Sequence, residues 1–155
     1  MSATGLEVVD TTVQKTMGWL KEIMEELGWG DRHRAYLALR AALHQVRDRL
    51  TTDEVAHLGA QLPMLVRGIY YEGWDPALPS RERTAEEFIS ALIDYFPNDP
   101  DLDYKAVMVA SLAVISRHVD AGMVRHIRAA MPGQIRDLWP EEAALAHNGG
   151  THRRR

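Results

Sequence analysis

Two histidines and two arginines recur at a fixed spacing, and their side chains could bind a ligand. His57 and Arg67 are followed by His126 and Arg136, each 69 residues further along the chain. An imidazole titrates near neutral pH, and a guanidinium can hold a carboxylate or a phosphate with two parallel hydrogen bonds. The recurrence predicts either a paired pH-sensitive or ligand-binding site between two halves, or a shared structural role in hydrogen bonds to helix carbonyls. The structural role is the more common use of such residues.

Three aromatic residues, Tyr70, Tyr71 and Trp74, follow Arg67 and form the densest aromatic cluster of the chain. On a helix Tyr70 faces inward, and Tyr71 lies about 100° further round, at the rim. The cluster predicts a lid that clamps two halves together, or else a pocket or partner-binding surface, where aromatic residues beside an arginine are enriched. The candidate binding residues are therefore Arg67, Tyr70, Tyr71, Trp74, His57, His126 and Arg136.

A carboxylate and an imidazole three residues apart, Glu54 and His57, have the spacing found in di-iron helical bundles. Such a site needs a second copy, but Met123 stands where the second glutamate would be. Glu54 also lies three residues after Thr51, which is the spacing of a capping box at the start of a helix. We therefore expect no metal site. No phosphate-binding loop or nucleophile elbow occurs either, so the sequence predicts no cofactor and no catalytic residue.

Four amphipathic helices are expected before residue 72, after a flexible arm over residues 1–10. Apolar residues spaced three and four apart predict the first from Thr11 or Thr12 to Leu27, and the second from about Arg32 to Leu50. The capping box begins a third helix, and Pro63 begins a short fourth. Glycine and proline in residues 72–83 interrupt the helical pattern and indicate a connector.

The helical pattern then repeats at an offset of 69 residues. Every inward position from Trp19 to Tyr70 has an apolar counterpart, from Phe88 to Trp139. The sequence thus predicts an all-α fold in one duplicated domain over residues 1–150. Its two four-helix repeats, about 12–71 and 84–140, would pack about a pseudo-two-fold axis, and residues 141–155 would form a mostly flexible tail. The identities at this offset are Ala41/Ala110, Leu43/Leu112, Val55/Val124, His57/His126, Ala60/Ala129, Pro63/Pro132 and Arg67/Arg136.

The stretch HLGAQLPMLVRGIYYEGWDP, from His57 to Pro76, resembles the signature of an uncharacterised bacterial family that is common in actinobacteria. Its members combine QLP-x-L-x-RG-x-YYEGW in the first half with a vaguer LP…LW-P in the second. The resemblance runs from roughly the first helix to Pro140, and it is weaker in the second copy at Met131 and at Gly133-Gln134. It implies an all-helical duplicated domain of unknown function. It implies no activity, cofactor or catalytic residue.

Composition and charge narrow the function classes. The chain has 155 residues, a net charge of −4 and no cysteine, and no apolar run approaches the length of a membrane span. We expect a cytoplasmic, membrane-free protein, and nucleic acid is a disfavoured partner, with Arg40 and Arg47 as its weak candidate contacts. The first hypothesis is a non-enzymatic interaction module that binds a protein partner or itself, as a homodimer. The alternative is a small-ligand-binding protein or enzyme with a site between the repeats near Arg67 and Tyr71.

Overall fold

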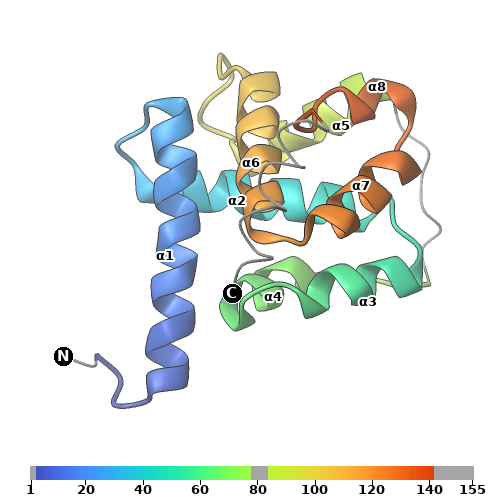
Figure 1. The fold of residues 1–155 in the computed structure, drawn as a ribbon. Helices are drawn as coiled ribbons and strands as arrows, with labels where there is room; N and C mark the ends of the chain where they lie inside the picture. The colour runs from blue at the N-terminus through green and yellow to red at the C-terminus, as the bar shows by residue number, and fades with distance from the viewer. Residues whose placement is uncertain (1–2, 78–83, 142–155) are drawn as a thin grey trace.

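The computed structural model describes residues 3–77 and 84–141, and every regular element within them is a helix (Figure 1). The expected all-α class is confirmed. The elements, in chain order, are α1 (Glu7–Leu27), α2 (Arg32–Arg47), α3 (Thr52–Ala60), α4 (Met64–Tyr71), α5 (Ala85–Ser90), the 3-10 helix η1 (Ala91–Tyr95), α6 (Tyr104–His118), α7 (Ala121–Ala130) and α8 (Gly133–Arg136).

Local hydrogen bonds explain where several helices begin and end. The Asp31 carboxylate accepts a hydrogen bond from the backbone of α2, and Thr51 and Glu54 form the expected reciprocal capping box at α3. At Thr84 the hydroxyl accepts a hydrogen bond from the Glu87 N–H. Gly28, with φ 65°, ends α1 in the left-handed conformation that glycine adopts without strain.

Two boundaries differ from the expected ones. The first helix begins at Glu7 and not at Thr11 or Thr12, so the flexible arm predicted for residues 1–10 is wrong from Glu7 onward. Its first turn is tied back because the Asp10 carboxylate accepts hydrogen bonds from the Thr4 backbone and hydroxyl. The second helix ends at Arg47, three residues before Leu50. Most of the predicted tail, residues 142–155, and residues 78–83 of the connector lie outside the described residues.

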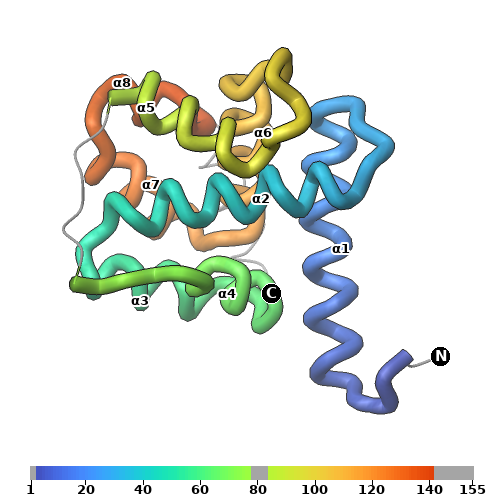
Figure 2. The backbone as a smooth tube through the Cα atoms, turned by 180° about the vertical axis from the view of Figure 1, so that it is seen from behind, coloured from blue at the N-terminus to red at the C-terminus, as the bar shows by residue number. Residues whose placement is uncertain are grey.

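Helices α2 and α6 cross at the centre of the molecule, and α1 packs against both of them and against α4. On the other side, η1 packs against α2, and α5 packs against α6 and α8 (Figures 1 and 2). The first turns of α1 project beyond the other helices (Figures 1 and 2). The core between α2 and α6 includes four fully buried side chains, Leu39, Leu43, Met108 and Leu112.

Candidate functional site

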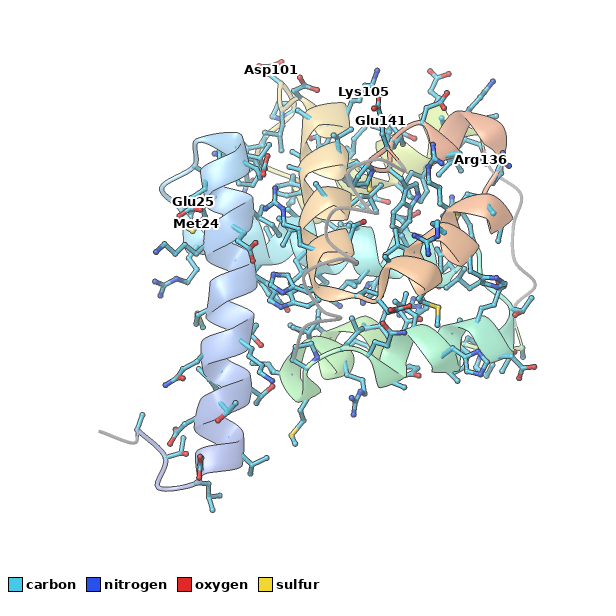
Figure 3. All side chains as sticks on the ribbon, in the orientation of Figure 1. Met24, Glu25, Asp101, Lys105, Arg136 and Glu141 are labelled. Atoms are coloured by element: carbon cyan, nitrogen blue, oxygen red, sulfur yellow. The ribbon has the colours of Figure 1, made fainter. Side chains whose placement is uncertain are left out.

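The two recurring arginines make the structural hydrogen bonds that the sequence allowed for. Arg67 donates from Nε to the Gly59 carbonyl (2.7 Å) and from Nη2 to the Leu62 carbonyl (2.8 Å), so it satisfies the carbonyls at the end of α3. Arg136, which points outward from α8 (Figure 3), donates from Nη2 to the Met131 carbonyl (3.1 Å) after α7. Each guanidinium is held beside a helix end by the backbone that it caps.

The aromatic cluster forms a closed lid over α3. Tyr70 is fully buried and donates its hydroxyl proton to the Val55 carbonyl (2.9 Å), and burial raises the pKa of this hydroxyl. Tyr71 covers Gly59 so closely that a Cβ atom there would lie 2.5 Å from the tyrosine oxygen. Trp74 packs on Tyr71 with ring centroids 5.6 Å apart. These contacts hold the cluster against α3, which belongs to the same half of the chain.

The recurring histidines are both on the surface and have different surroundings. His126 lies with Nε2 2.9 Å from a carboxylate oxygen of Glu54. Burial opposes the charge on Glu54, but hydrogen bonds from Thr51 and His126 lower its pKa overall. Among the described residues His57 has no hydrogen-bond partner and no contact joins the two imidazoles. The structure thus gives no support for the paired histidine site.

A buried polar cluster at the C-terminal end of α2 was not predicted. The His44 ring contacts the Tyr95 hydroxyl through Nδ1 (3.0 Å) and the Ile69 carbonyl through Nε2 (2.8 Å). Burial lowers the pKa of His44. Arg47 donates to the carbonyls of Tyr70 and Glu72, both at 2.8 Å. These hydrogen bonds join side chains of α2 to carbonyls at the end of α4 and to a hydroxyl of η1. The cluster therefore ties the end of α4 to α2 and η1 and does not form an open site.

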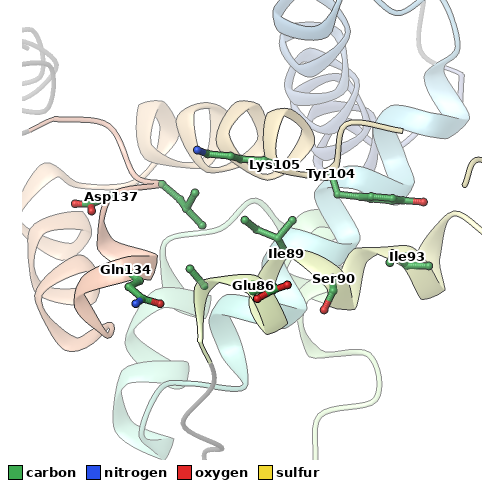
Figure 4. Close-up of a pocket in the computed structure, with 10 residues that line it drawn as sticks. Glu86, Ile89, Ser90, Ile93, Tyr104, Lys105, Gln134 and Asp137 are labelled. Atoms are coloured by element: carbon green, nitrogen blue, oxygen red, sulfur yellow. The ribbon is translucent and has the colours of Figure 1, made fainter. Parts of the chain in front are cut away.

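An apolar groove lies between α5, α6 and α8 (Figure 4), and the sequence did not indicate it. Its volume is about 630 Å³, within the range of small-molecule and side-chain pockets. Ile93 on its floor keeps 48% of its surface exposed. Lys105 lies on one side of the groove, and Glu86 and Asp137 lie on the others. The remaining lining residues are Ala85, Ile89, Ser90, Tyr104, Gln134 and Leu138.

A second hollow, of about 580 Å³, lies between α1, the turn from α3 to α4, and the end of α6. It includes Arg67, the one predicted binding residue that lines a described cavity. On its wall the His118 imidazole stacks on the Trp19 indole, with centroids 4.7 Å apart. The other lining residues are Lys15, Gly18, Gln61, Leu62, Pro63 and Met64.

The described part of the chain contains no group of three or more histidine, aspartate or glutamate side chains that could hold a metal ion. No helix within residues 3–77 or 84–141 combines the length and apolarity that crossing a membrane requires.

Comparison with known proteins gives one match. Residues 16–138, from the middle of α1 to just beyond α8, are similar to a family described as "Uncharacterized conserved protein (DUF2267)". No curated protein matches the chain. The family description names no activity.

Proposed function

The chain belongs to the DUF2267 family of uncharacterised conserved proteins, and from this premise we propose that it is a non-enzymatic interaction module whose α5–α6–α8 groove binds an amphipathic helix. The exposure of Ile93 carries this proposal. A large apolar side chain left nearly half exposed in a concave apolar surface loses the roughly 25 cal/mol per Å² that burial would supply. Exposed apolar surface of this kind is typical of interaction sites.

The occupant that fits best is α1 of a second copy. Leu6, Val9, Val13 and Met17 are spaced three and four residues apart, so they form one stripe on α1. Leu6 is 58% exposed and Met17 is 38% exposed, and the first turns of α1 project from the molecule (Figure 1). An apolar stripe with this spacing is what a helix presents to a groove.

Charge at the edges of the two surfaces is complementary. Lys21 is exposed on α1, one turn beyond Met17, and Glu86 and Asp137 lie on the rim of the groove. Each copy carries one stripe and one groove, so two copies can make the same contact twice about a two-fold axis. A homodimer built in this way would bury both surfaces that a single chain leaves exposed.

Sedimentation velocity on the full chain tests this proposal. The wild type is expected to sediment as a dimer, and Ile93→Glu or Met17→Glu is expected to give a monomer, because either change places a charge in the apolar contact. Val109→Glu is the matched control, since Val109 is an exposed apolar residue of α6 outside the groove. A wild type that stays monomeric at its highest soluble concentration, or a Val109→Glu variant that dissociates as fully as Ile93→Glu, would contradict the proposal.

We also infer that the domain consists of two repeats related by 69 residues and packed about a pseudo-two-fold axis. Pro63 and Pro132 support this, since both precede short helices with almost equal backbone angles (φ −55° and −54°, ψ 150° and 147°). The arginine bonds also support it, because the two acceptors, Leu62 and Met131, are 69 residues apart, as Arg67 and Arg136 are. A cytoplasmic location and a bacterial origin remain part of the proposal.

A further inference from the structure

We propose that the hollow between α1, the α3–α4 turn and the end of α6 binds a small organic oxyanion, a phosphate or a carboxylate joined to an apolar group. Three basic side chains line it, Lys15, Arg67 and His118, and no carboxylate is among the lining residues that the structure describes. The site is separate from the α5–α6–α8 groove, so either proposal can fail without the other.

Arg67 is held in place for this role before any ligand arrives. Its Nε and Nη2 atoms donate to the carbonyls of Gly59, Ala60 and Leu62, which fixes the plane of the guanidinium. Within the described part of the chain Nη1 has no hydrogen-bond partner, so its two protons remain for a ligand. A donor that is already fixed loses little conformational entropy when it binds.

Gln61 supplies a neutral donor beside the basic groups. Its Oε1 atom accepts a hydrogen bond from the backbone N–H of Asp120 (2.7 Å), which sets the orientation of the amide. The amide nitrogen is then the end of the side chain left to donate to a ligand, and no described residue accepts from it. Together with Arg67 and Lys15 it gives a hollow that offers donors and lacks charged acceptors, which is the chemistry that an oxyanion requires.

The walls of the hollow account for the apolar part of the ligand. Met64, which is 55% exposed, lies at the edge of the hollow, and the buried Trp19 indole (2% exposed) stacks on His118 at its side. The nearest acid to the stack is Glu22, whose carboxylate contacts both His118 and Arg117 and does not line the hollow. An aromatic or aliphatic group next to the anionic head would cover Met64.

NMR titration of the full-length protein with three probes tests the site. Inorganic phosphate, phenyl phosphate and benzoate are added at constant ionic strength, and amide and indole shifts are followed. We expect shifts concentrated at Trp19, Gln61 and Arg67, and tighter binding of phenyl phosphate than of inorganic phosphate. Comparison of phenyl phosphate with benzoate then shows which head group is preferred. Shifts spread over the surface, or equal binding of phenyl phosphate and inorganic phosphate, would overturn the proposal.

Variants that leave the fold intact complete the test. Lys15→Gln removes an exposed charge at the hollow and is expected to weaken phenyl phosphate binding about fivefold, whereas Lys21→Gln, on the same helix but outside the hollow, should change it less than about twofold. Gln61→Glu keeps the acceptor for Asp120 but puts a negative charge in the hollow, so it should weaken binding by more than about tenfold. Equal effects of Lys15→Gln and Lys21→Gln, or no effect of Gln61→Glu, would overturn the site.

Discussion

The imidazole of His118 stacks on the indole of Trp19, with ring centroids 4.7 Å apart and 17° between the ring planes. A second contact of this kind joins Arg49 and Phe88. The Arg49 guanidinium lies 4.5 Å from the centroid of the Phe88 ring. Trp19 and Phe88 are 69 residues apart, and so are Arg49 and His118. In each pair a basic side chain from one half covers an aromatic ring of the other, which is the exchange that two repeats about a common axis would produce.

Removal of the stacked imidazole should therefore cost stability. His118→Ala is expected to lower the free energy of unfolding by about 1 kcal/mol, because aromatic pairs contribute roughly 0.5–1.5 kcal/mol beyond simple burial. Urea denaturation measures the change. His57→Ala is the control, since His57 is exposed and stacks on no ring among the described residues, and its effect should lie within about 0.5 kcal/mol. Equal losses in the two variants would show that the stack contributes nothing.

The arginine at the end of α3 should matter more than an exposed charge. Arg67→Met removes the donors to the Gly59 and Leu62 carbonyls, and the loss of bonds to partly buried carbonyls is expected to cost about 1–3 kcal/mol. Arg67→Lys should not restore this stability, because one ammonium cannot reproduce the forked geometry of a guanidinium. Chemical denaturation checks both variants. Arg125→Met on the exposed face of α7 serves as the comparison, and a similar loss there would contradict the capping role.

Two helical glycines offer a test of the aromatic lid. At Gly59 a methyl group would meet Tyr71, so Gly59→Ala is expected to destabilise the fold by about 1–3 kcal/mol despite the better helix propensity of alanine. At Gly18 a methyl group would meet nothing within 4 Å, so Gly18→Ala should stabilise it by about 0.5–1 kcal/mol. Thermal melting of both variants measures the contrast. If Gly59→Ala also stabilises, Tyr71 is not packed as a closed lid.

The sequence predicted features that depend on neighbouring residues and missed those that depend on distant ones. Asp31, Thr51 and Gly28 act on their own helix ends, so their roles could be inferred from spacing alone. His44 also lies on the inward face of α2, but its partners Ile69 and Tyr95 are 25 and 51 residues away. Nothing in a helical pattern identifies such partners.

The α5–α6–α8 groove was missed for a related reason. At the offset of 69 residues the first predicted helix implies a continuous counterpart ending near Phe96, but the structure has the short α5 and then η1. This break sets how Ile89 and Ile93 are presented, and Ile93 remains 48% exposed. Periodicity marks both isoleucines as apolar, but it does not show whether a neighbouring helix covers them. For the recurring arginines the sequence left a structural and a ligand-binding role open, and the structure shows Arg67 and Arg136 bonded to backbone carbonyls.

Stability should fall as the pH falls below the ordinary histidine range, and His44 should be a principal cause. Burial lowers the pKa of His44 below its ordinary value of 6.5, and the nearby charges of Arg47 and Arg40 act in the same direction, although the Ile69 hydrogen bond and Asp48 oppose them. Between the two pKa values the unfolded chain binds a proton that the folded chain does not. The stability that neutral His44 contributes is therefore present above pH 6.5 and is lost as the pH falls toward the folded-state pKa.

His44→Gln separates this effect from other titrations. A glutamine can still donate toward the Ile69 carbonyl and accept from the Tyr95 hydroxyl, but it does not titrate, so the variant should lose stability less steeply between about pH 7 and about pH 5. Urea denaturation at a series of pH values gives the slope. His57→Gln is the matched control for replacing an imidazole by glutamine at an exposed site. Glu54 affects stability at lower pH, because its pKa lies below 4.5. If the wild type and His44→Gln lose stability equally steeply above pH 5, a group other than His44 causes the pH dependence.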